Sequence, residues 1–220
     1  MAASQIIYGR QPVAEAERGR RAVKRVWRAP ETSAEELERL CGSPDHQGVV
    51  AEVDPFPYAD PNAVASGDGL VVALDQVQDP RNLGAVARSA EVAGASGLVI
   101  PERRAAEVTA VACKASAGAV EHLPIARVRN LADWLALAKD SGFWIWGADA
   151  DAPGPPWKAD LSGPLVIVLG GEGQGIRPRV AAACDGLMAL PQAGRVGSLN
   201  VSAAAAALLF EAVRQRSATP

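Results

Sequence analysis

The segment "LVIVLGGEGQGIRP" (residues 165–178) joins an uninterrupted apolar run to a glycine-rich loop. Apolar residues fill positions 165–169, and glycines follow at 170, 171, 173 and 175. Strands that are buried on both faces read as continuous apolar runs, which is typical of parallel sheets between layers of helices. Glycines directly after such a strand let the backbone approach a ligand closely. This stretch therefore predicts a buried parallel strand that ends at a binding site.

Similar apolar runs recur after residue 70, with helical segments between them. The alternation predicts an α/β domain, in which helices flank both faces of a parallel sheet. The expected strands lie at 70–75, 97–100, 123–128, 143–149, 165–170 and 186–191. The expected helices lie at 82–94, 105–116, 131–142, 178–184 and 200–216.

The first part of the chain has a different composition. Residues 10–28 carry seven arginines and lysines against two glutamates. The segment "TSAEELERLCG" (32–42) has a capping hydroxyl, early acids and a closing glycine, which predicts a short helix. Proline and glycine are frequent at 54–69, as in a linker. We therefore expect a small N-terminal domain over residues 1–60, a linker over 61–68 and a larger domain over 69–220.

The overall composition limits the possible function classes. A net charge of -3 over 220 residues is not typical of a general nucleic-acid binder, so any basic surface must be local. The three cysteines lie far apart and only two histidines are present, so no metal site is expected. The longest uncharged apolar run is about half as long as a membrane span requires. Together with the odd cysteine count and the lack of a recognisable signal peptide, these features predict a soluble, cytoplasmic protein.

The glycine-rich loop fits neither of the common nucleotide-binding patterns. In the dinucleotide-binding pattern the third glycine would fall on Ile176, and the phosphate-binding pattern lacks its Lys-Ser/Thr pair. A carboxylate at Glu172 would also repel a phosphate. The ligand is therefore expected to carry hydrogen-bond donors or positive charge, as S-adenosylmethionine does. A tight turn with a surface glutamate is the alternative interpretation.

Two further stretches leave the carboxyl ends of predicted strands. The stretch at 75–100 enters a helix that has Asn82 near its start and Arg88 among small apolar residues. The stretch at 190–210 enters the last helix through Ser198 and Asn200, for which helix capping is the alternative role. Parallel strands end at one edge of a sheet, where open α/β sheets bind ligands, so the three loops are expected to converge there.

The three stretches together resemble the motifs of the SpoU (TrmH-type) branch of the SPOUT RNA 2′-O-methyltransferases. The matching residues are Asp79-Pro80-x-Asn82-x-Gly84-Ala85 to Arg88-Ser89-Ala90, Gly170-x-Glu172-Gly173-x-Gly175, and Leu190-Pro191 to Ser198-Leu199-Asn200-Val201-Ser202. The resemblance covers residues 68–216 and is greatest to the subgroup that methylates a guanosine ribose in 23S rRNA. The N-terminal part resembles the small L30e-like RNA-binding domain of that subgroup in a shortened form.

The resemblance implies features that periodicity does not reveal. These are a deep trefoil knot in the C-terminal part of the sheet, a homodimer, S-adenosylmethionine as cofactor and RNA as substrate. The implied cofactor-binding residues are Gly170, Gly171, Gly175, Leu190 and Leu199. The residues implied in catalysis and substrate placement are Asn82, Arg88, Glu172, Ser198 and Asn200. The basic residues expected to contact RNA are Arg10, Arg18, Arg20, Arg21, Lys24, Arg25 and Lys114.

The implied reaction is the attack of a ribose 2′-hydroxyl on the sulfonium methyl group. The three motifs contain no His, Cys or Lys that could act as an ordinary base. Because an arginine stays protonated, Arg88 is expected to stabilise developing negative charge or to clamp a neighbouring phosphate, with phosphate or water as the proton acceptor. Alternative substrates are tRNA or an rRNA site of antibiotic resistance. A nucleotide-binding oxidoreductase and a non-catalytic RNA-binding protein are alternatives from other classes.

Overall fold

A computed structural model describes residues 4–171, 173, 175–195 and 197–218. By their contacts the residues form two compact units. The first unit comprises residues 1–57, 80–88 and 107–122, and the second comprises residues 58–79, 89–106 and 123–220. Each unit has its own β-sheet, and each is described separately below.

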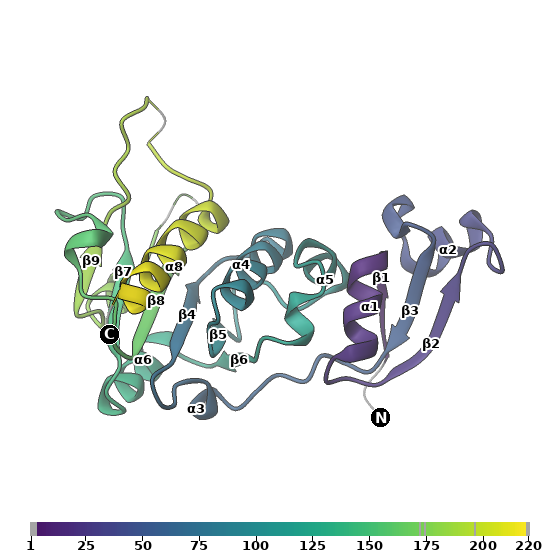
Figure 1. Cartoon of the computed structure of the whole chain (residues 1–220), viewed down its shortest axis with the longest axis horizontal. Coiled ribbons are helices and arrows are strands. Elements are labelled where there is room, and N and C mark those ends of the chain that lie inside the picture. The colour runs from purple at the N-terminus through teal and green to yellow at the C-terminus, as the bar shows by residue number, and fades with distance from the viewer. Residues whose placement is uncertain (1–3, 172, 174, 196, 219–220) are drawn as a thin grey trace. The chain divides into compact units, whose positions relative to one another are not determined.

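The second unit is built on a six-stranded parallel sheet in the order β6-β5-β4-β8-β7-β9 (Figure 1). The predicted α/β architecture is confirmed, and each predicted strand is present within a few residues of its expected bounds. The strands are β4 (Leu70–Asp75), β5 (Gly97–Pro101), β6 (Ile125–Val128), β7 (Trp144–Ala148), β8 (Leu165–Gly170) and β9 (Gly186–Met188).

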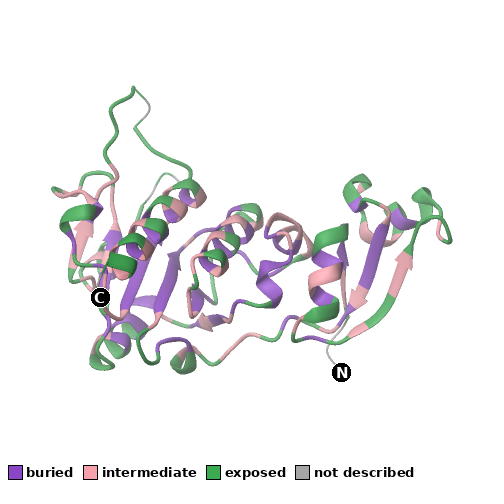
Figure 2. Cartoon of the chain, viewed as in Figure 1, coloured by how far each residue is buried: buried purple, intermediate pink, exposed green. Residues whose placement is uncertain are grey.

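The central strands β4 and β8 are adjacent although about ninety residues separate them in the sequence. Leu70 pairs with Leu165 and Asp75 with Gly170, so both strands end at the same level. Every residue of β4 is buried, which explains why its sequence is apolar without alternation. Figure 2 shows these strands as buried ribbons behind helices whose outward surfaces are exposed.

Helices cover both faces of this sheet. On one face, α6 (Leu131–Asp140) and α7 (Pro178–Ala181) pack in a core with alternate residues of β4 and β8 such as Val71 and Val166. The other face is covered by α8 (Val201–Ala218), which packs against β8 and crosses in front of it in Figure 1. Alternate side chains of a strand point to opposite faces, so both sets of apolar residues are buried.

Shorter elements complete the second unit. They are α3 (Pro61–Val64) and the single 3-10 turn η3 (Pro156–Lys158). No helix within the described ranges is both long and apolar enough to cross a membrane.

The first unit contains a three-stranded antiparallel sheet in the order β1-β3-β2. The sequence leaves room for one strand and one helix between the stretches at 6–16 and 46–53, and the structure has one strand and one α-helix there. The elements are β1 (Gln5–Tyr8), α1 (Arg10–Arg18), β2 (Val23–Arg28), α2 (Ala34–Cys41), η1 (Pro44–His46), β3 (Val49–Val53), α5 (Ala110–Ala115) and η2 (Ala119–Glu121). The bounds of β2 could not be placed from sequence, because three basic residues interrupt any apolar run in this edge strand.

Local sequence explains the helices of this unit. Helix α2 occurs where it was predicted: the Ser33 side chain accepts a hydrogen bond from Glu36 N, and Gly42 ends the helix at φ 69°. The helix predicted over 105–116 is shorter than expected. It begins after Thr109, whose hydroxyl oxygen accepts a hydrogen bond from Ala112 N at 3.4 Å.

Helix α4 (Pro80–Val92) contributes its first nine residues to the first unit and the remainder to the second. It begins at Pro80 rather than at the predicted residue 82, because proline favours the first position of a helix. Asn82 therefore lies inside the first turn of the helix and is not its N-cap.

Candidate functional site

A pocket of about 520 Å³ opens at the carboxyl edge of the parallel sheet. Its walls come from the segments that follow β7, β8 and β9 and from the first turn of α8. The lining residues are Ala148, Asp149, Ala150, Asp151, Leu169, Gly170, Gly171, Gly173, Gly175, Met188, Leu190, Gln192, Ser198, Leu199, Val201 and Ala204. The structure thus brings all five predicted cofactor-binding residues to one pocket, although residues 170 and 199 lie far apart in sequence.

Backbone forms the glycine wall of this pocket. Gly171 N donates to Asp75 O at 2.8 Å, and Gly175 N donates to Gly171 O at 3.1 Å, so the loop folds back on itself. A Cβ atom at Gly170 would overlap the carbonyl group of Gly175, and a Cβ at Gly171 would lie 2.5 Å from Gln76 O. Side chains are therefore excluded at residues 170 and 171, and a ligand at this wall would meet main-chain groups.

An ion pair between a buried aspartate and a partly exposed arginine holds the far end of the glycine loop. Asp75, the last residue of β4, is fully buried. Its Oδ2 accepts from the backbone N–H of Arg177 at 2.8 Å, while Oδ1 accepts from Nε at 2.8 Å and lies 2.6 Å from Nη2. This pair joins the end of β4 to the end of the loop. Sequence reasoning missed it, although an aspartate at the end of an otherwise apolar strand was a usable signal.

The segment after β7 brings two carboxylates to the pocket that sequence reasoning also missed. Asp149 and Asp151 follow β7 and line the pocket. Asp151 N donates to Asp149 Oδ1 at 2.9 Å, which fixes the turn. The described lining residues include no lysine, arginine or histidine. Such a pocket favours a cation over a phosphate, in agreement with the failed phosphate-loop pattern.

The predicted catalytic residues are distributed over several elements. Ser198 lines the pocket, and Asn200 caps α8 by accepting hydrogen bonds from Ser202 N at 2.8 Å and from Ser202 Oγ at 2.6 Å. Glu172 lies outside the described residues. On α4, Asn82 is buried and Arg88 is exposed. No residue of the first motif (79–90) is among the described residues that line the pocket, so the expected convergence is found for two of the three motif loops.

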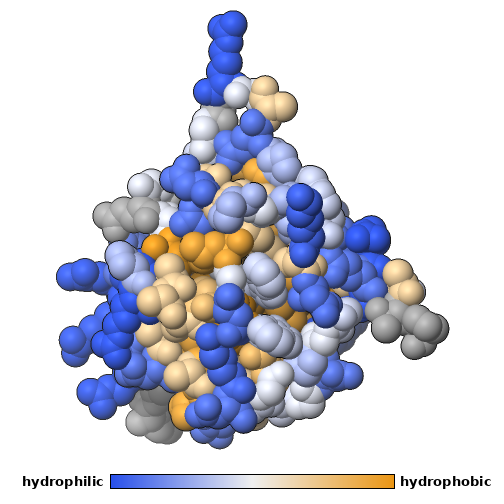
Figure 3. Space-filling view, turned by 90° about the vertical axis from the view of Figure 1, so that its left-hand side faces the viewer, coloured by the Kyte–Doolittle hydropathy of each residue, from blue (hydrophilic) through white to orange (hydrophobic). Residues whose placement is uncertain are grey.

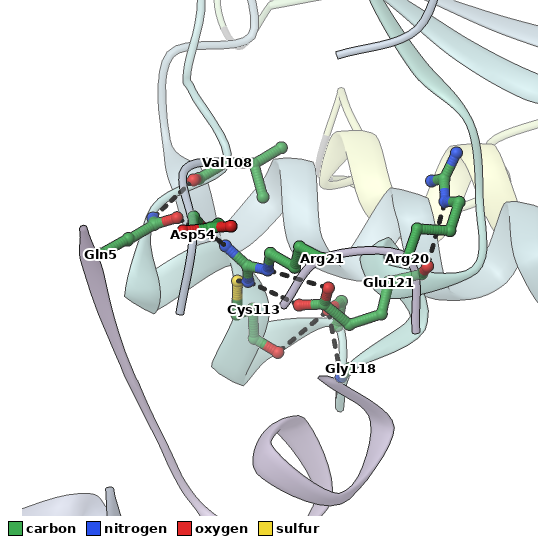
Figure 4. Close-up of polar contacts among 9 residues, drawn as sticks. Gln5, Arg20, Arg21, Asp54, Val108, Cys113, Gly118 and Glu121 are labelled. Carbon is green, nitrogen blue, oxygen red and sulfur yellow. Dashed lines mark hydrogen bonds and ion pairs between the residues drawn. The ribbon is translucent and has the colours of Figure 1, made fainter. Parts of the chain in front are cut away.

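One predicted RNA-binding residue has a different environment from that expected. The guanidinium of Arg21 is buried and lies 2.5 Å from Glu121, and Nε donates to the second carboxylate oxygen at 2.9 Å (Figure 4). Nη1 donates to Gln5 at 2.6 Å, and Nη2 donates to the Cys113 sulfur at 3.2 Å. A side chain that is 1% exposed cannot contact RNA, so the prediction for Arg21 is wrong.

The surroundings of Arg21 favour its charged state. Burial lowers the pKa of the guanidinium, but the hydrogen bond and the attraction to Glu121 outweigh this effect, so the pKa is raised. Burial is also the main reason why the pKa of the Cys113 thiol rises to about 11. The cysteine is therefore a neutral thiol at neutral pH and is not a reactive nucleophile.

The other predicted RNA-binding residues are at the surface of the first unit or partly buried there. Arg20 and Lys24 line a second hollow of about 640 Å³, in which Lys24 pairs with Asp54 at 2.9 Å. Lys114 donates to Asp45 O at 2.9 Å, and partial burial lowers its pKa. The remaining three, Arg10, Arg18 and Arg25, are exposed.

Residues 69–210 match the family model described as the SpoU rRNA Methylase family. The chain belongs to this family. The predicted family is confirmed: this protein is a SpoU RNA methyltransferase, and S-adenosylmethionine is the methyl donor of the family. No group of three or more potential metal-ligating side chains occurs among the residues that the structure describes.

Proteins with similar sequences and structures agree with this assignment. An uncharacterized tRNA/rRNA methyltransferase of Mycobacterium sp. (strain KMS) is 39% identical over 97% of this chain and 77% of its own length. The 23S rRNA (guanosine-2′-O-)-methyltransferase RlmB of Photobacterium profundum is 44% identical over 78% of this chain and 72% of its own. The SpoU methyltransferase AviRb from Streptomyces viridochromogenes, solved in complex with AdoMet, is 25% identical with a TM-score of 0.85, covering 99% of this chain and 92% of AviRb.

Proposed function

We propose that this protein transfers a methyl group from S-adenosylmethionine to a ribose 2′-hydroxyl of a guanosine in 23S rRNA. The observation that carries the proposal is the convergence of the second and third motif segments, together with the segment after β7, on one pocket with a glycine-backbone wall. The guanosine and the 23S rRNA are supported by the 44% identity to the RlmB enzyme of Photobacterium profundum.

The residues of the pocket fit S-adenosylmethionine. A volume of about 520 Å³ lies within the usual range of small-molecule sites. Main-chain groups at Gly170 and Gly171 suit the hydrogen-bonding edges of an adenine and a ribose, and bulkier residues there would fill the space. Asp149 and Asp151 suit a ligand that carries two positive charges. We assign the binding of the cofactor to Gly170, Gly171, Gly175, Leu190 and Leu199.

When bound, the cofactor supplies a methyl group that is activated by a positively charged sulfur. The protein must then hold the ribose in line with that group and stabilise the oxygen as its proton leaves. We assign this stabilisation to the guanidinium of Arg88, which remains charged and can bind a phosphate or an alkoxide through two N–H groups. Phosphate or water accepts the proton.

Four other residues complete the proposed set. Asn200 is held by its bond with Ser202 and orients the ribose, and Ser198 lies beside the cofactor. Asn82 and Glu172 are assigned to substrate placement from their motif positions alone. These roles for Asn82, Arg88, Glu172, Ser198 and Asn200 remain predictions.

We further infer a homodimer and a deep trefoil knot in the C-terminal part of the sheet, as the family resemblance implies. Support for an interface comes from exposed large apolar side chains of the second unit, among them Trp144, Trp157 and Phe210. Figure 3 shows apolar surface gathered on the β9 side of the molecule.

We propose that residues 1–60 act as an RNA-binding domain, residues 61–68 as a linker and residues 69–220 as the catalytic domain. Six basic residues of the predicted RNA-binding set support this role, because they are at least partly accessible in the first unit. An rRNA substrate also supports a cytoplasmic location.

The proposed function is tested with the purified chain, S-adenosylmethionine labelled in the methyl group, and unmodified 23S rRNA and tRNA transcripts. We expect label at a guanosine 2′-oxygen of 23S rRNA, which is mapped by ribose-methylation sequencing. Transfer to tRNA alone would support the alternative substrate. Label on a base, or no transfer to any transcript, would contradict the proposed reaction.

A further inference from the structure

The carboxyl edge of the six-stranded sheet is divided by charge. On the β9-β7-β8 side, the described pocket wall carries two carboxylates and no cation. On the β5-β6 side, Arg103 and Arg104 follow β5 and Arg129 follows β6, and all three are exposed. Glu102 is the acid among these exit residues. We call Arg103, Arg104 and Arg129 the basic edge.

The strand register places the three arginines together. Pro101 pairs with Val128, and Glu102 N donates to Val128 O at 2.9 Å, so the residues after both strands leave the sheet at the same level. Neighbouring strands are about 4.8 Å apart, which places the basic edge about 10–15 Å from the glycine wall on β8. This distance exceeds the screening length of about 8 Å at physiological salt, so the carboxylates of the pocket do not neutralise the arginines.

The basic edge differs from other surface arginines of the second unit. Arg179 pairs with Asp133 at 2.6 Å, and Arg214 pairs with Glu211 at 2.8 Å. The side chains of the basic edge form no ion pair or hydrogen bond with another residue that the structure describes. Three neighbouring uncompensated arginines in a chain of net charge -3 favour an anionic ligand at this edge.

The loop that carries two of these arginines is anchored at both ends. Nη2 of Arg127, whose guanidinium lies over the Tyr58 ring, donates to Glu102 O at 3.0 Å. Ala106 N donates to Val77 O at 2.8 Å. Between these anchors, Arg104 adopts a left-handed conformation with φ 56°. The charges are therefore presented from a fixed backbone, which lowers the entropy lost on binding.

We propose that the basic edge binds phosphates of the RNA strand that flanks the methylated nucleotide. The inference rests on the proposed function, because it requires a nucleotide at the pocket. The sheet edge then separates two ligands by charge: the acidic side receives the cationic cofactor, and the basic side receives the polyanion. Arginine suits this role because its planar guanidinium binds phosphate through two hydrogen bonds. The RNA strand leaves the pocket across the ends of β4, β5 and β6.

The test compares the wild type with the double variant Arg103→Gln/Arg104→Asn, since asparagine tolerates the left-handed conformation at residue 104. Binding of unmodified 23S rRNA is measured by filter binding over a series of KCl concentrations. Loss of two phosphate contacts lowers the slope of log affinity against log salt by about 1.4 and weakens binding about 10- to 30-fold near 0.1 M salt. Addition of Arg129→Gln lowers the slope by about a further 0.7. Binding of S-adenosylmethionine, measured by calorimetry, stays unchanged.

The matched control is Lys158→Gln/Arg214→Gln, which removes the same charge near the opposite end of the strands. That position follows from two contacts of the end of α8: Arg216 donates to Gly69 O at 3.1 Å just before β4, and Gln215 donates to Pro156 O at 3.4 Å in η3, which contains Lys158. We expect the control to keep the wild-type slope. Equal slopes in the wild type and the double variant would contradict phosphate binding by the basic edge, but would not affect the proposed function. If the wild type methylates no RNA, both the proposed function and phosphate binding by the basic edge are contradicted. This outcome is seen with the wild type alone and needs no variant.

Discussion

Two buried carboxylates, Glu121 in the first unit and Asp75 in the second, each bind an arginine that lies about one hundred residues away in sequence. We call the first pair closed, because the side chains of Arg21 and Glu121 are each only 1% exposed. The second pair is open, since 42% of the Arg177 side chain is exposed while Asp75 is fully buried. The same chemistry therefore serves two purposes. The closed pair fastens segments of one unit together, whereas the open pair shapes the loop that lines the pocket.

The largest effect is expected from breaking the closed pair. Arg21→Met leaves Glu121 buried without its cation, which lowers the free energy of unfolding by about 3–5 kcal/mol. Urea unfolding followed by circular dichroism measures the change. The double variant Arg21→Met/Glu121→Leu removes both charges and is expected to recover most of the stability. A single variant as stable as the wild type would show that the pair is not important for folding.

A smaller effect on stability but a clear effect on the pocket is expected at Gly170. In Gly170→Ala the new methyl group overlaps the backbone of Gly175, so the loop must move and S-adenosylmethionine binds up to about 100-fold more weakly. Calorimetry measures the affinity. Gly194→Ala is the control, because no atom lies within 4 Å of a Cβ there. Equal affinities of the two variants would exclude the proposed role of the glycine wall.

Breaking the open pair is expected to lower the free energy of unfolding less than breaking the closed pair does. Asp75→Asn keeps the size and one acceptor oxygen but loses the charge, and Arg177 can turn to solvent. We expect a loss of about 1.5 kcal/mol in the free energy of unfolding together with a raised KM for S-adenosylmethionine at a nearly unchanged kcat. Arg177→Lys should retain part of the affinity because it keeps the charge. A fall in kcat alone would contradict a role in shaping the cofactor pocket.

The smallest effect is expected from the pair of Glu211 and Arg214 at the surface of α8, in which the arginine is exposed and the glutamate is partly buried. Hydrogen bonds from Arg214 and Gln215 lower the pKa of Glu211 from 4.5 to about 2. A lowered pKa in the folded state stabilises the protein above about pH 4.5, and this contribution is lost as the pH falls towards 2. Solvent screening keeps the contribution small. Thermal melting of the wild type and Glu211→Gln between these pH values should show a shallower pH dependence in the variant.

The parallel sheet and the pocket could be predicted to a large extent from sequence. Strands buried on both faces carry continuous apolar runs, and their ends are marked by glycine or aspartate, as at Asp75 and Gly170. Five glycine and leucine positions from the second and third motifs all line one pocket. The strands of the N-terminal sheet could not be placed from sequence, because β2 carries exposed basic residues and β1 has four residues, too few to show a period.

Sequence by itself determined the apolar runs, the helix caps such as Ser33, and the motifs that identify a SpoU methyltransferase, since these depend on residues close together in the chain. Only the tertiary structure decided which charges are compensated. It buried Arg21 beside Glu121, joined Arg177 to Asp75, and left the basic edge without partners among the described residues. The reason is physical: the free energy of a charge depends on its burial and on neighbours brought close by folding, and neither can be read from local sequence.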